Sequence, residues 1–256
     1  MKVLACLKRV PNTGAKIVLT EDEQRIDTSG LGFTMSPHEE CAIEGAVAQV
    51  ETHGGSAHLL TLGPPEADEQ LRTGLAMQAD EATLLETDDE EWSPRATADA
   101  IADGIDRLDD DEGFDLLLFG NESADAANYQ VGVRVANALG YPCVTGIKDL
   151  EIEDGTAIAR REISGGEEVY EIDLPAVVTV KEGLNEPRYA SMRAKMQARR
   201  QEIESVDPRA ETRAGGLEKV RLEAPETDDS PAEILGEGPE AVPDIVEILV
   251  EEVEVV

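Results

Sequence analysis

The sequence predicts an α/β protein built on a mostly parallel sheet, with an antiparallel portion and a C-terminal arm. In the first half of the chain, short runs of consecutive apolar residues alternate with longer segments whose apolar residues have helical spacing. Strands that are apolar on both faces and alternate with helices are typical of a parallel sheet covered by helices on both sides. In the second half, strand patterns separated by glycines indicate hairpins.

The predicted elements of the first half follow one another in a regular order. Strands are expected at residues 2–7, 57–62, 82–85 and 115–119, and helices at residues 37–50, 66–79, 93–108 and 128–139. Two helices carry start signals, because Ser36 precedes Pro37 and Ser93 precedes Pro94. Serine is favoured at the N-cap and proline in the first helical turn. Gly140 is the expected stop of the fourth helix.

The second half predicts hairpins, one more buried strand and an arm. Residues 148–173 read as the hairpin system, and residues 174–180 (LPAVVTV) as a buried strand. We place one α/β domain at residues 1–204. Residues 205–243 contain five prolines and the acidic run at 226–229, which is typical of a linker. Residues 244–256 are apolar again and are expected to pack on their own domain or on a partner.

The charge balance excludes several classes of protein. Lys and Arg total 22 and Asp and Glu total 56, so the net charge is −34. A free-standing nucleic-acid binder or a protein attached to an anionic membrane needs basic residues to meet phosphates. Carboxylates spread along the whole chain predict adaptation to concentrated salt, the alternative being a generic acidic protein. No apolar run is long enough to span a membrane, and the N-terminal run is short. We therefore expect a soluble cytoplasmic protein.

The loops after the predicted strands are the candidate binding sites. A parallel sheet binds ligands beyond the carboxyl ends of its strands. The loop at residues 120–132 directly follows one strand, is rich in small and hydrogen-bonding residues, and leads into a helix. Helix N-termini offer N–H groups to phosphates, and Asp125 could accept from a ribose hydroxyl. The alternative is a loop that only caps the helix. No glycine-rich nucleotide fingerprint is present.

Catalytic residues are not indicated by the sequence. His38, His53 and His58 have no metal-ligand partners nearby, and no nucleophile elbow is present. Cys6 lies within a predicted buried strand, where a structural thiol is the default. The three cysteines form no zinc or disulfide pattern.

A basic segment interrupts the acidic chain. Residues 187–201 contain five Lys or Arg residues and no Asp or Glu. One interpretation is a docking surface for an acidic partner, or a cover for an anionic cofactor. The other is a cationic helix that pairs with carboxylates of its own domain.

Several motifs in this order give the chain a resemblance to the β subunits of electron transfer flavoproteins. They include residues 1–11 (MKVLACLKRVP), 34–40 (TMSPHEE), 72–80 (RTGLAMQAD) and 115–120 (DLLLFG). The most specific are residues 161–163 (REI) with Gly165 and Gly166, 174–180, and 184–192 (LNEPRYASM).

The resemblance implies a Rossmann-like adenine-nucleotide-binding domain whose C-terminal arm packs on a partner α subunit. The redox FAD of this family sits mainly in the α subunit, at the interface between the subunits. AMP, or a second FAD, binds in the β subunit. Electrons pass from acyl-CoA dehydrogenase-type flavoproteins of fatty acid β-oxidation to a membrane quinone oxidoreductase. The resemblance therefore implies an electron carrier subunit rather than an enzyme in its own right.

The resemblance also carries over site residues. The family's nucleotide falls on Cys6, Ser36, Leu62, Gly63, Gly120, Asp125, Asn128, Tyr129, Gln130, Val131 and Gly132. Its recognition loop falls on residues 184–196, with partner contacts at Leu184, Asn185, Pro187, Arg188, Tyr189, Met192, Arg193 and Lys195. Met192 matches the apolar side chain that anchors the dehydrogenase. Glu162 matches a carboxylate that contacts the mobile FAD domain.

One departure leaves the second nucleotide open. AMP-binding members have consecutive acids before Asn-Gln-Thr-Gly, whereas residues 125–132 read DAANYQVG. This loop is closer to the Fix-type branch, in which some members bind a second FAD and bifurcate electrons. Two further alternatives are a stand-alone nucleotide-binding module without a redox role and a hydrolase acting on an adenine nucleotide.

Overall fold

A computed structural model describes residues 1–12, 14–88, 91–108, 113–209, 219–225 and 234–251. The chain divides into two compact units. The first comprises residues 1–18 and 26–219 and contains the α/β domain. The second comprises residues 19–25 and 220–256. Within the described residues, no helix combines the length and apolar character needed to cross a membrane.

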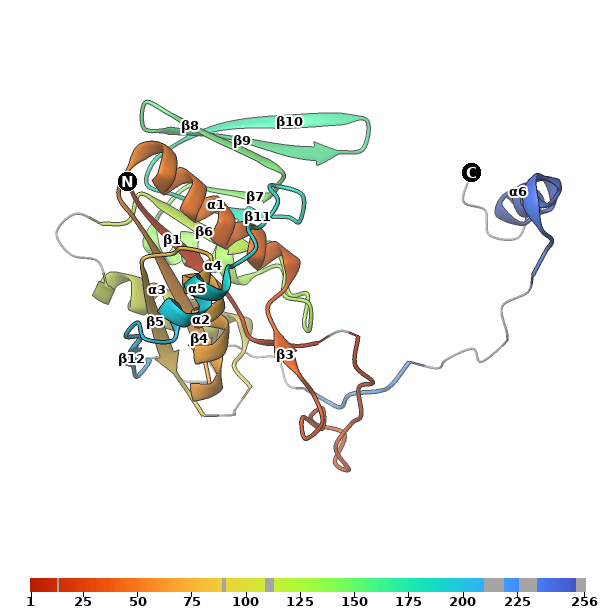
Figure 1. Cartoon of the computed structure of the whole chain (residues 1–256), viewed down its shortest axis with the longest axis horizontal. Coiled ribbons are helices and arrows are strands. Elements are labelled where there is room, and N and C mark those ends of the chain that lie inside the picture. The colour runs from red at the N-terminus through yellow and green to blue at the C-terminus, as the bar shows by residue number, and fades with distance from the viewer. Residues whose placement is uncertain (13, 89–90, 109–112, 210–218, 226–233, 252–256) are drawn as a thin grey trace. The chain divides into compact units, whose positions relative to one another are not determined.

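The α/β domain is built on a parallel sheet, as predicted (Figure 1). Among the described residues its strands lie in the order β12 (Glu204–Val206), β5 (Glu81–Glu86), β4 (Ser56–Gly63), β1 (Lys2–Cys6), β6 (Leu116–Gly120), β11 (Ala176–Val180) and β7 (Cys143–Ile147). Every neighbouring pair is parallel. The central strands are buried along nearly their whole length, as expected for a sheet covered on both faces.

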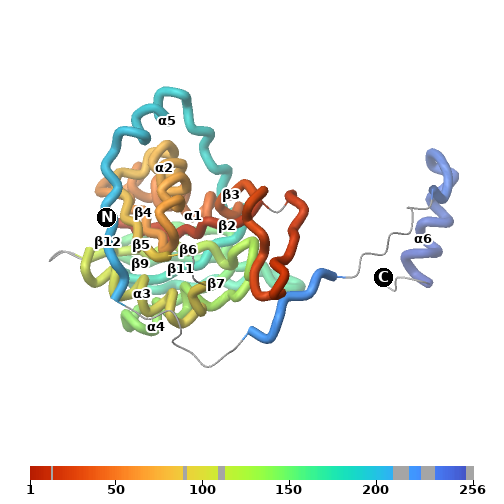
Figure 2. The backbone as a smooth tube through the Cα atoms, turned by 90° about the horizontal axis from the view of Figure 1, so that it is seen from below, coloured from red at the N-terminus to blue at the C-terminus, as the bar shows by residue number. Residues whose placement is uncertain are grey.

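Helices cover both faces of this sheet. Side chains of α1 (Pro37–His53) and α2 (Asp68–Ala76) pack with Val3, Ala5 and Leu59 in one cluster. Side chains of α3 (Pro94–Leu108) and α4 (Val131–Leu139) pack with Leu4 and Leu60 in a second cluster on the opposite face. Alternate residues of β1 therefore point to opposite faces. The short helix α5 (Met192–Ala198) lies beside α2 (Figure 2).

The helix starts follow the predicted capping chemistry in two cases and differ in one. Ser36 has extended backbone, and the Glu39 carboxylate accepts its N–H at 2.8 Å. Ser93 Oγ accepts the N–H of Ala96 at 3.1 Å. The predicted start of the fourth helix at residue 128 is wrong, because α4 begins at Val131. Ala127 and Tyr129 have φ angles of 44° and 57°, which a right-handed helix cannot contain.

The predicted hairpins form a sheet of their own. Its strand order is β10 (Gly166–Asp173), β9 (Thr156–Ile163) and β8 (Asp149–Glu153), and both pairs are antiparallel. The expected buried strand at residues 174–180 is β11, which joins the parallel sheet. Strand β7 was not predicted, because Thr145 and Gly146, whose φ is +69°, interrupt its apolar run. Strand β12 extends the parallel sheet through Val206.

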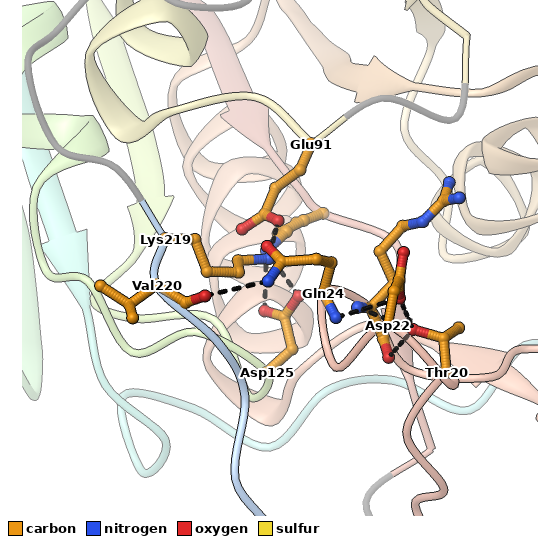
Figure 3. Close-up of polar contacts among 9 residues, drawn as sticks. Thr20, Asp22, Gln24, Glu91, Asp125, Lys219 and Val220 are labelled. Atoms are coloured by element: carbon orange, nitrogen blue, oxygen red, sulfur yellow. Dashed lines mark hydrogen bonds and ion pairs between the residues drawn. The ribbon is translucent and has the colours of Figure 1, made fainter.

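A short strand pairing precedes the first helix in the first unit, and hydrogen bonds between distant residues join the segments of the second unit. In the first unit, β2 (Val10–Pro11) pairs with β3 (Phe33–Thr34). In the second unit, the Gln24 side chain donates to the Val220 carbonyl at 2.9 Å (Figure 3). The Leu222 N–H donates to the Glu23 carbonyl at 2.8 Å. The predicted apolar tail, residues 244–256, lies in α6 (Val242–Glu251) as far as it is described, and its residues 252–256 lie outside the described residues. The short helix η2 (Gly238–Ala241) precedes it, within the predicted linker.

Candidate functional site

The strand order places a topological switch point at the carboxyl ends of β1 and β6. Strand β1 leads into α1 on one face, and its neighbour β6 leads into α4 on the other face. Where the loops after two neighbouring strands run toward opposite faces of the sheet, a crevice forms between them. Doubly wound sheets bind their ligands in this crevice. We call the residues after β1, the start of α1 and the loop after β6 the switch-point site.

A lysine and an aspartate join the two sides of this site. Lys8, directly after β1, donates to both carboxylate oxygens of Asp125 at 2.7 Å, and its Nζ lies 3.5 Å from Ser123 Oγ. Burial acts to raise the pKa of Asp125, but the charge and hydrogen bonds of Lys8 outweigh it, and the pKa lies below its ordinary value. Asp125 thus contacts a cation in this structure. The sequence places Lys8 at the start of a candidate binding loop, residues 8–14, but gives it no individual role.

The start of α1 approaches the end of β6 closely. A Cβ atom on Gly120 would lie 2.8 Å from Glu39 Cγ and 3.3 Å from the Glu39 nitrogen, so only glycine fits without displacement. Glu39 is almost fully buried. Burial raises its pKa to about 7, against the opposing effects of hydrogen bonds from Ser36 and the charge of Lys8. The Ser36 side chain is buried beside this carboxylate, and Ser36 and Glu39 form a capping box at the start of α1.

Two other glycines of the predicted site also allow close approach. A Cβ on Gly132 would lie 2.8 Å from Thr179 Cγ2, which brings the start of α4 against β11. A Cβ on Gly63 would lie 3.3 Å from the Ala67 Cβ, where the chain turns from β4 into η1 (Pro65–Ala67). The three glycines therefore let the turn after β4 and the starts of α1 and α4 pack closely against their neighbours around the switch-point site.

The loop between β6 and α4 is exposed, and contacts near its two ends fix it to neighbouring elements. Asn128 and Tyr129 are exposed, while Gln130 accepts hydrogen bonds from Arg134 at 2.9 and 3.1 Å. His38 bridges neighbouring loops, because its Nδ1 accepts the Glu182 N–H at 2.7 Å and its Nε2 lies 3.3 Å from Glu122. The Nδ1 contact assigns the proton to Nε2.

The remaining predicted nucleotide residues line the strand ends. Cys6 is buried in β1, and burial, followed by the Glu39 charge, raises the pKa of its thiol well above the ordinary value. Leu62 is half-buried at the end of β4, and Val131 opens α4. A protonated Cys6 thiol at the end of a buried strand is suited to packing rather than to nucleophilic chemistry.

The structure divides the predicted recognition loop into a fixed base and an exposed tip. Leu184 packs against the core, and Asn185 Nδ2 donates to the Cys41 carbonyl at 2.9 Å. Arg188 binds two carboxylates of α1. At the tip, Tyr189 is 91% exposed and Met192 is 75% exposed. Pro187, Arg193 and Lys195 are also exposed.

Glu162 lies near the end of β9. Its carboxylate contacts Lys148 Nζ at 2.7 Å, and its side chain is 66% exposed. The neighbouring Arg161 bonds to Glu168 and to the Tyr170 hydroxyl. The ion pair holds the Glu162 carboxylate on an exposed surface, where another protein can reach it.

Together, the fold and the switch-point site define a doubly wound α/β protein of the kind that holds nucleotides at its strand ends. The sequence pattern of the electron transfer flavoprotein domain matches residues 25–211. The electron transfer flavoprotein subunit beta of Bacillus subtilis is 36% identical over 207 residues, which cover 81% of this chain and 79% of the relative. The chain belongs to the electron transfer flavoprotein β-subunit family. The resemblance predicted from the motifs is confirmed, and the salt-adapted origin stays a prediction.

Other relatives differ widely in source. The human electron transfer flavoprotein subunit beta is 34% identical over 212 residues, covering 81% of this chain and 82% of the relative. The caffeyl-CoA reductase-Etf complex subunit CarD of Acetobacterium woodii is 36% identical over 208 residues, covering 79% of this chain and 77% of the relative.

Proposed function

We propose that this chain is the β subunit of a heterodimeric electron transfer flavoprotein that carries electrons from acyl-CoA dehydrogenase-type flavoproteins to a membrane quinone oxidoreductase. The observation that carries the proposal is the exposed tip of residues 184–196. Tyr189 and Met192 present apolar surface flanked by Arg193 and Lys195. Exposed aromatic and methionine side chains are typical anchors of protein interfaces, and cations steer an acidic partner.

In the proposed function, the bound cofactor carries out the redox chemistry and this chain provides binding surfaces. FAD, bound at the interface with the α subunit, supplies the uptake and release of electrons. This chain contributes surfaces: residues 184–196 meet the dehydrogenase, and Glu162 meets the FAD-bearing domain of the α subunit. The exposure of Glu162 and its ion pair with Lys148 are compatible with that role. The same carrier would then deliver electrons to the quinone oxidoreductase.

The switch-point site fits an adenine nucleotide, either AMP or a second FAD. Ser36 is buried at the start of α1, and Gly63, Gly120 and Gly132 let a turn and two helix starts pack closely around the strand ends. Backbone N–H groups at helix starts bind phosphate oxygens. Lys8 would supply a positive charge to phosphate. The exposed residues 125–129 and the bordering residues 130–132 would enclose the ligand.

Nucleotide analysis of the co-expressed heterodimer tests the proposal directly. The chain and an electron transfer flavoprotein α subunit from the same genome would be co-expressed and purified together in high salt, and the nucleotides extracted and counted. One FAD and one AMP per heterodimer would support the dehydrogenase carrier. Absence of flavin would overturn the proposal and favour a stand-alone nucleotide-binding module. Hydrolysis of ATP or AMP with added magnesium would instead favour the hydrolase alternative.

A Fix-type bifurcating carrier is the second candidate. It is favoured by residues 125–132, which lack the consecutive acids of the AMP-binding branch, and by the similarity to CarD of a caffeyl-CoA reductase-Etf complex. Two FAD molecules per heterodimer would support this candidate. The second flavin would then occupy the switch-point site.

A further inference from the structure

Arg188 ties the docking segment, residues 184–201, to α1 near its beginning, just after the contact of Asn185 with the Cys41 carbonyl. The Arg188 guanidinium bonds to Glu44 at 2.8 and 2.9 Å and to Glu51 at 2.7 and 2.9 Å. The Arg188 backbone N–H also donates to Glu44 at 3.0 Å. Both carboxylates belong to α1, and the Arg188 side chain is only 21% exposed. These bonds raise the pKa of Arg188 and lower the pKa of Glu51. The charge of Arg188 therefore faces its own domain.

A second arginine fixes the end of the segment. Arg72 of α2 donates to the Ala198 carbonyl at 2.7 Å and to the Gln201 carbonyl at 3.2 Å. Asp68, one turn earlier, holds the same guanidinium at 2.6 and 3.0 Å. Ala198 is the last residue of α5 and is buried. Arg72 thus binds carbonyls at and just beyond the carboxyl end of α5, where backbone carbonyls lack helical partners.

Between these two arginines the segment is ordered but exposed. Ser191 Oγ accepts the Ala194 N–H at 3.2 Å and caps α5. The Lys195 Nζ lies 5.0 Å from the centre of the Tyr189 ring. Met192 and Met196 are 75% and 54% exposed. The exposed apolar residues therefore stand on a short helix whose two flanks are tied to α1 and α2.

We propose that Arg188 and Arg72 are positioning residues that hold the docking segment in its binding shape before any partner arrives. This inference rests on the proposed function. It separates the basic residues into two groups: Arg188 acts inward, and Arg193, Lys195, Arg199 and Arg200, all exposed, provide the charge that attracts the partner. Fixing an interface segment in advance reduces the ordering cost of association. Exposed charges mainly affect the association rate and its salt dependence.

Charge-conserving substitutions distinguish residues that position the docking segment from residues that attract the partner electrostatically. In the flavin-loaded heterodimer, Arg188→Lys and Arg72→Lys keep the charge but lose the planar, multidentate contacts. Electron uptake would be measured with an acyl-CoA dehydrogenase from the same genome, reduced by its acyl-CoA substrate. We expect KM for the dehydrogenase to rise about tenfold, with the dependence of kcat/KM on ionic strength unchanged. Arg95→Lys, in the exposed part of α3, is the matched control. Arg193→Gln is expected to weaken the dependence on ionic strength.

A combined variant distinguishes positioning from general destabilisation. If Arg188 acts through the placement of Met192, then Arg188→Lys adds little to the effect of Met192→Ala, because the anchor is already absent. Full additivity of the two effects on KM would contradict the proposal. Flavin content and melting temperature of each variant would be recorded with the rates.

Hydrogen exchange tests the same idea without a partner. In the free heterodimer, the amides of Ala194, Lys195 and Arg199, which bond within the segment, are expected to exchange faster in Arg188→Lys and Arg72→Lys than in wild type or Arg95→Lys. Unchanged exchange in both variants would overturn the proposal. If the wild-type heterodimer takes up no electrons from the dehydrogenase, the proposed function fails, while the exchange experiment still decides whether the arginines fix the segment.

Discussion

Glu39 connects the start of α1 to the switch-point site. Its carboxylate accepts the Ser36 N–H, and its side chain occupies the space beside Gly120. Burial raises its pKa from the ordinary 4.5 to about 7. A buried carboxyl near Lys8 but not ion-paired with it is neutral in mildly acidic solution and charged in alkaline solution. Glu39 therefore makes the stability of the fold depend on pH.

The sign of this dependence follows from the two pKa values. The unfolded chain loses the Glu39 proton near 4.5 and the folded chain near 7, so the stabilising contribution is complete below pH 4.5 and is lost as pH rises through 7. Relative to Glu39→Gln, the wild-type free energy of unfolding should fall by about 3 kcal/mol across this window. Urea unfolding of the wild type and of Glu39→Gln across this pH range checks the expected fall. An equal pH dependence in the two proteins would contradict the prediction.

Lys8 is the residue whose loss should weaken nucleotide binding most selectively. It places a positive charge between the two loops of the switch-point site, where it now contacts Asp125. Lys8→Gln should lower the affinity for AMP about tenfold, because one charge-assisted contact to phosphate is lost. Equilibrium dialysis of the heterodimer measures the change. Arg95→Gln removes the same charge outside the site, and an equal loss of affinity there would argue against a local role.

At the scale of single residues, the sequence predicts which loops form the candidate site better than it predicts which side chains contact one another. Asp125 could be placed in the candidate site because it follows a buried strand. Its contact with Lys8 spans 117 positions and depends on the strand order, which a single sequence does not determine. The sequence likewise left open whether the basic segment faces a partner or pairs with its own domain. The Arg188 partners Glu44 and Glu51 lie 144 and 137 positions away, so no local pattern indicates these contacts.

At the scale of elements, the strongest local patterns were the most predictable. Strands β1 and β6 are almost wholly apolar, β4 is mostly apolar, and a serine followed by proline stands at the starts of α1 and α3. Strand β7 and the start of α4 could not be predicted, because the residue pattern does not specify the positive φ angles that Gly146 and Tyr129 adopt there. The edge strand β12 has only three residues, too few for a period-two pattern.

Close contact between α1 and β6 makes one glycine a structural requirement. Gly120→Ala should lower the free energy of unfolding by about 1–3 kcal/mol, because the new methyl group would displace Glu39 or the α1 backbone. Gly166→Ala in β10 is the matched control, since no atom lies within 4 Å of its added Cβ. Thermal unfolding of the two variants checks the difference. Equal melting temperatures would show that α1 moves aside at little cost.

At the scale of the whole molecule, net charge should dominate the response to salt. A net charge of −34 repels itself, and raising salt from about 0.1 M to 1 M shortens the screening length from about 10 Å to about 3 Å. The melting temperature should rise with KCl by about 2–4 °C for each kcal/mol of repulsion removed. Sucrose at equal osmolality stabilises without screening and serves as the control. An equal rise in sucrose would contradict the electrostatic explanation.

The family could be predicted from the sequence, because its motifs lie in order along most of the chain. The assignment of AMP or a second FAD could not, because it depends on the shape of residues 121–132 around a ligand. The parallel sheet followed from the alternation of strands and helices. The separation of the hairpins into their own sheet depends on β9 packing residues such as Ala157 and Ala159 into the core beside α1, a contact that no local pattern specifies.

The pairing of Gln24 with Val220 has a consequence for the order of synthesis. The two residues are separated by 196 positions, and the neighbouring bond joins Glu23 to Leu222. A ribosome therefore has to translate almost the entire chain before residues 19–25 meet their partner segment. The second unit can close only after the strands of the α/β domain have been made. A nascent chain thus presents its α/β domain to the cell first, and completes the second unit as one of its last steps.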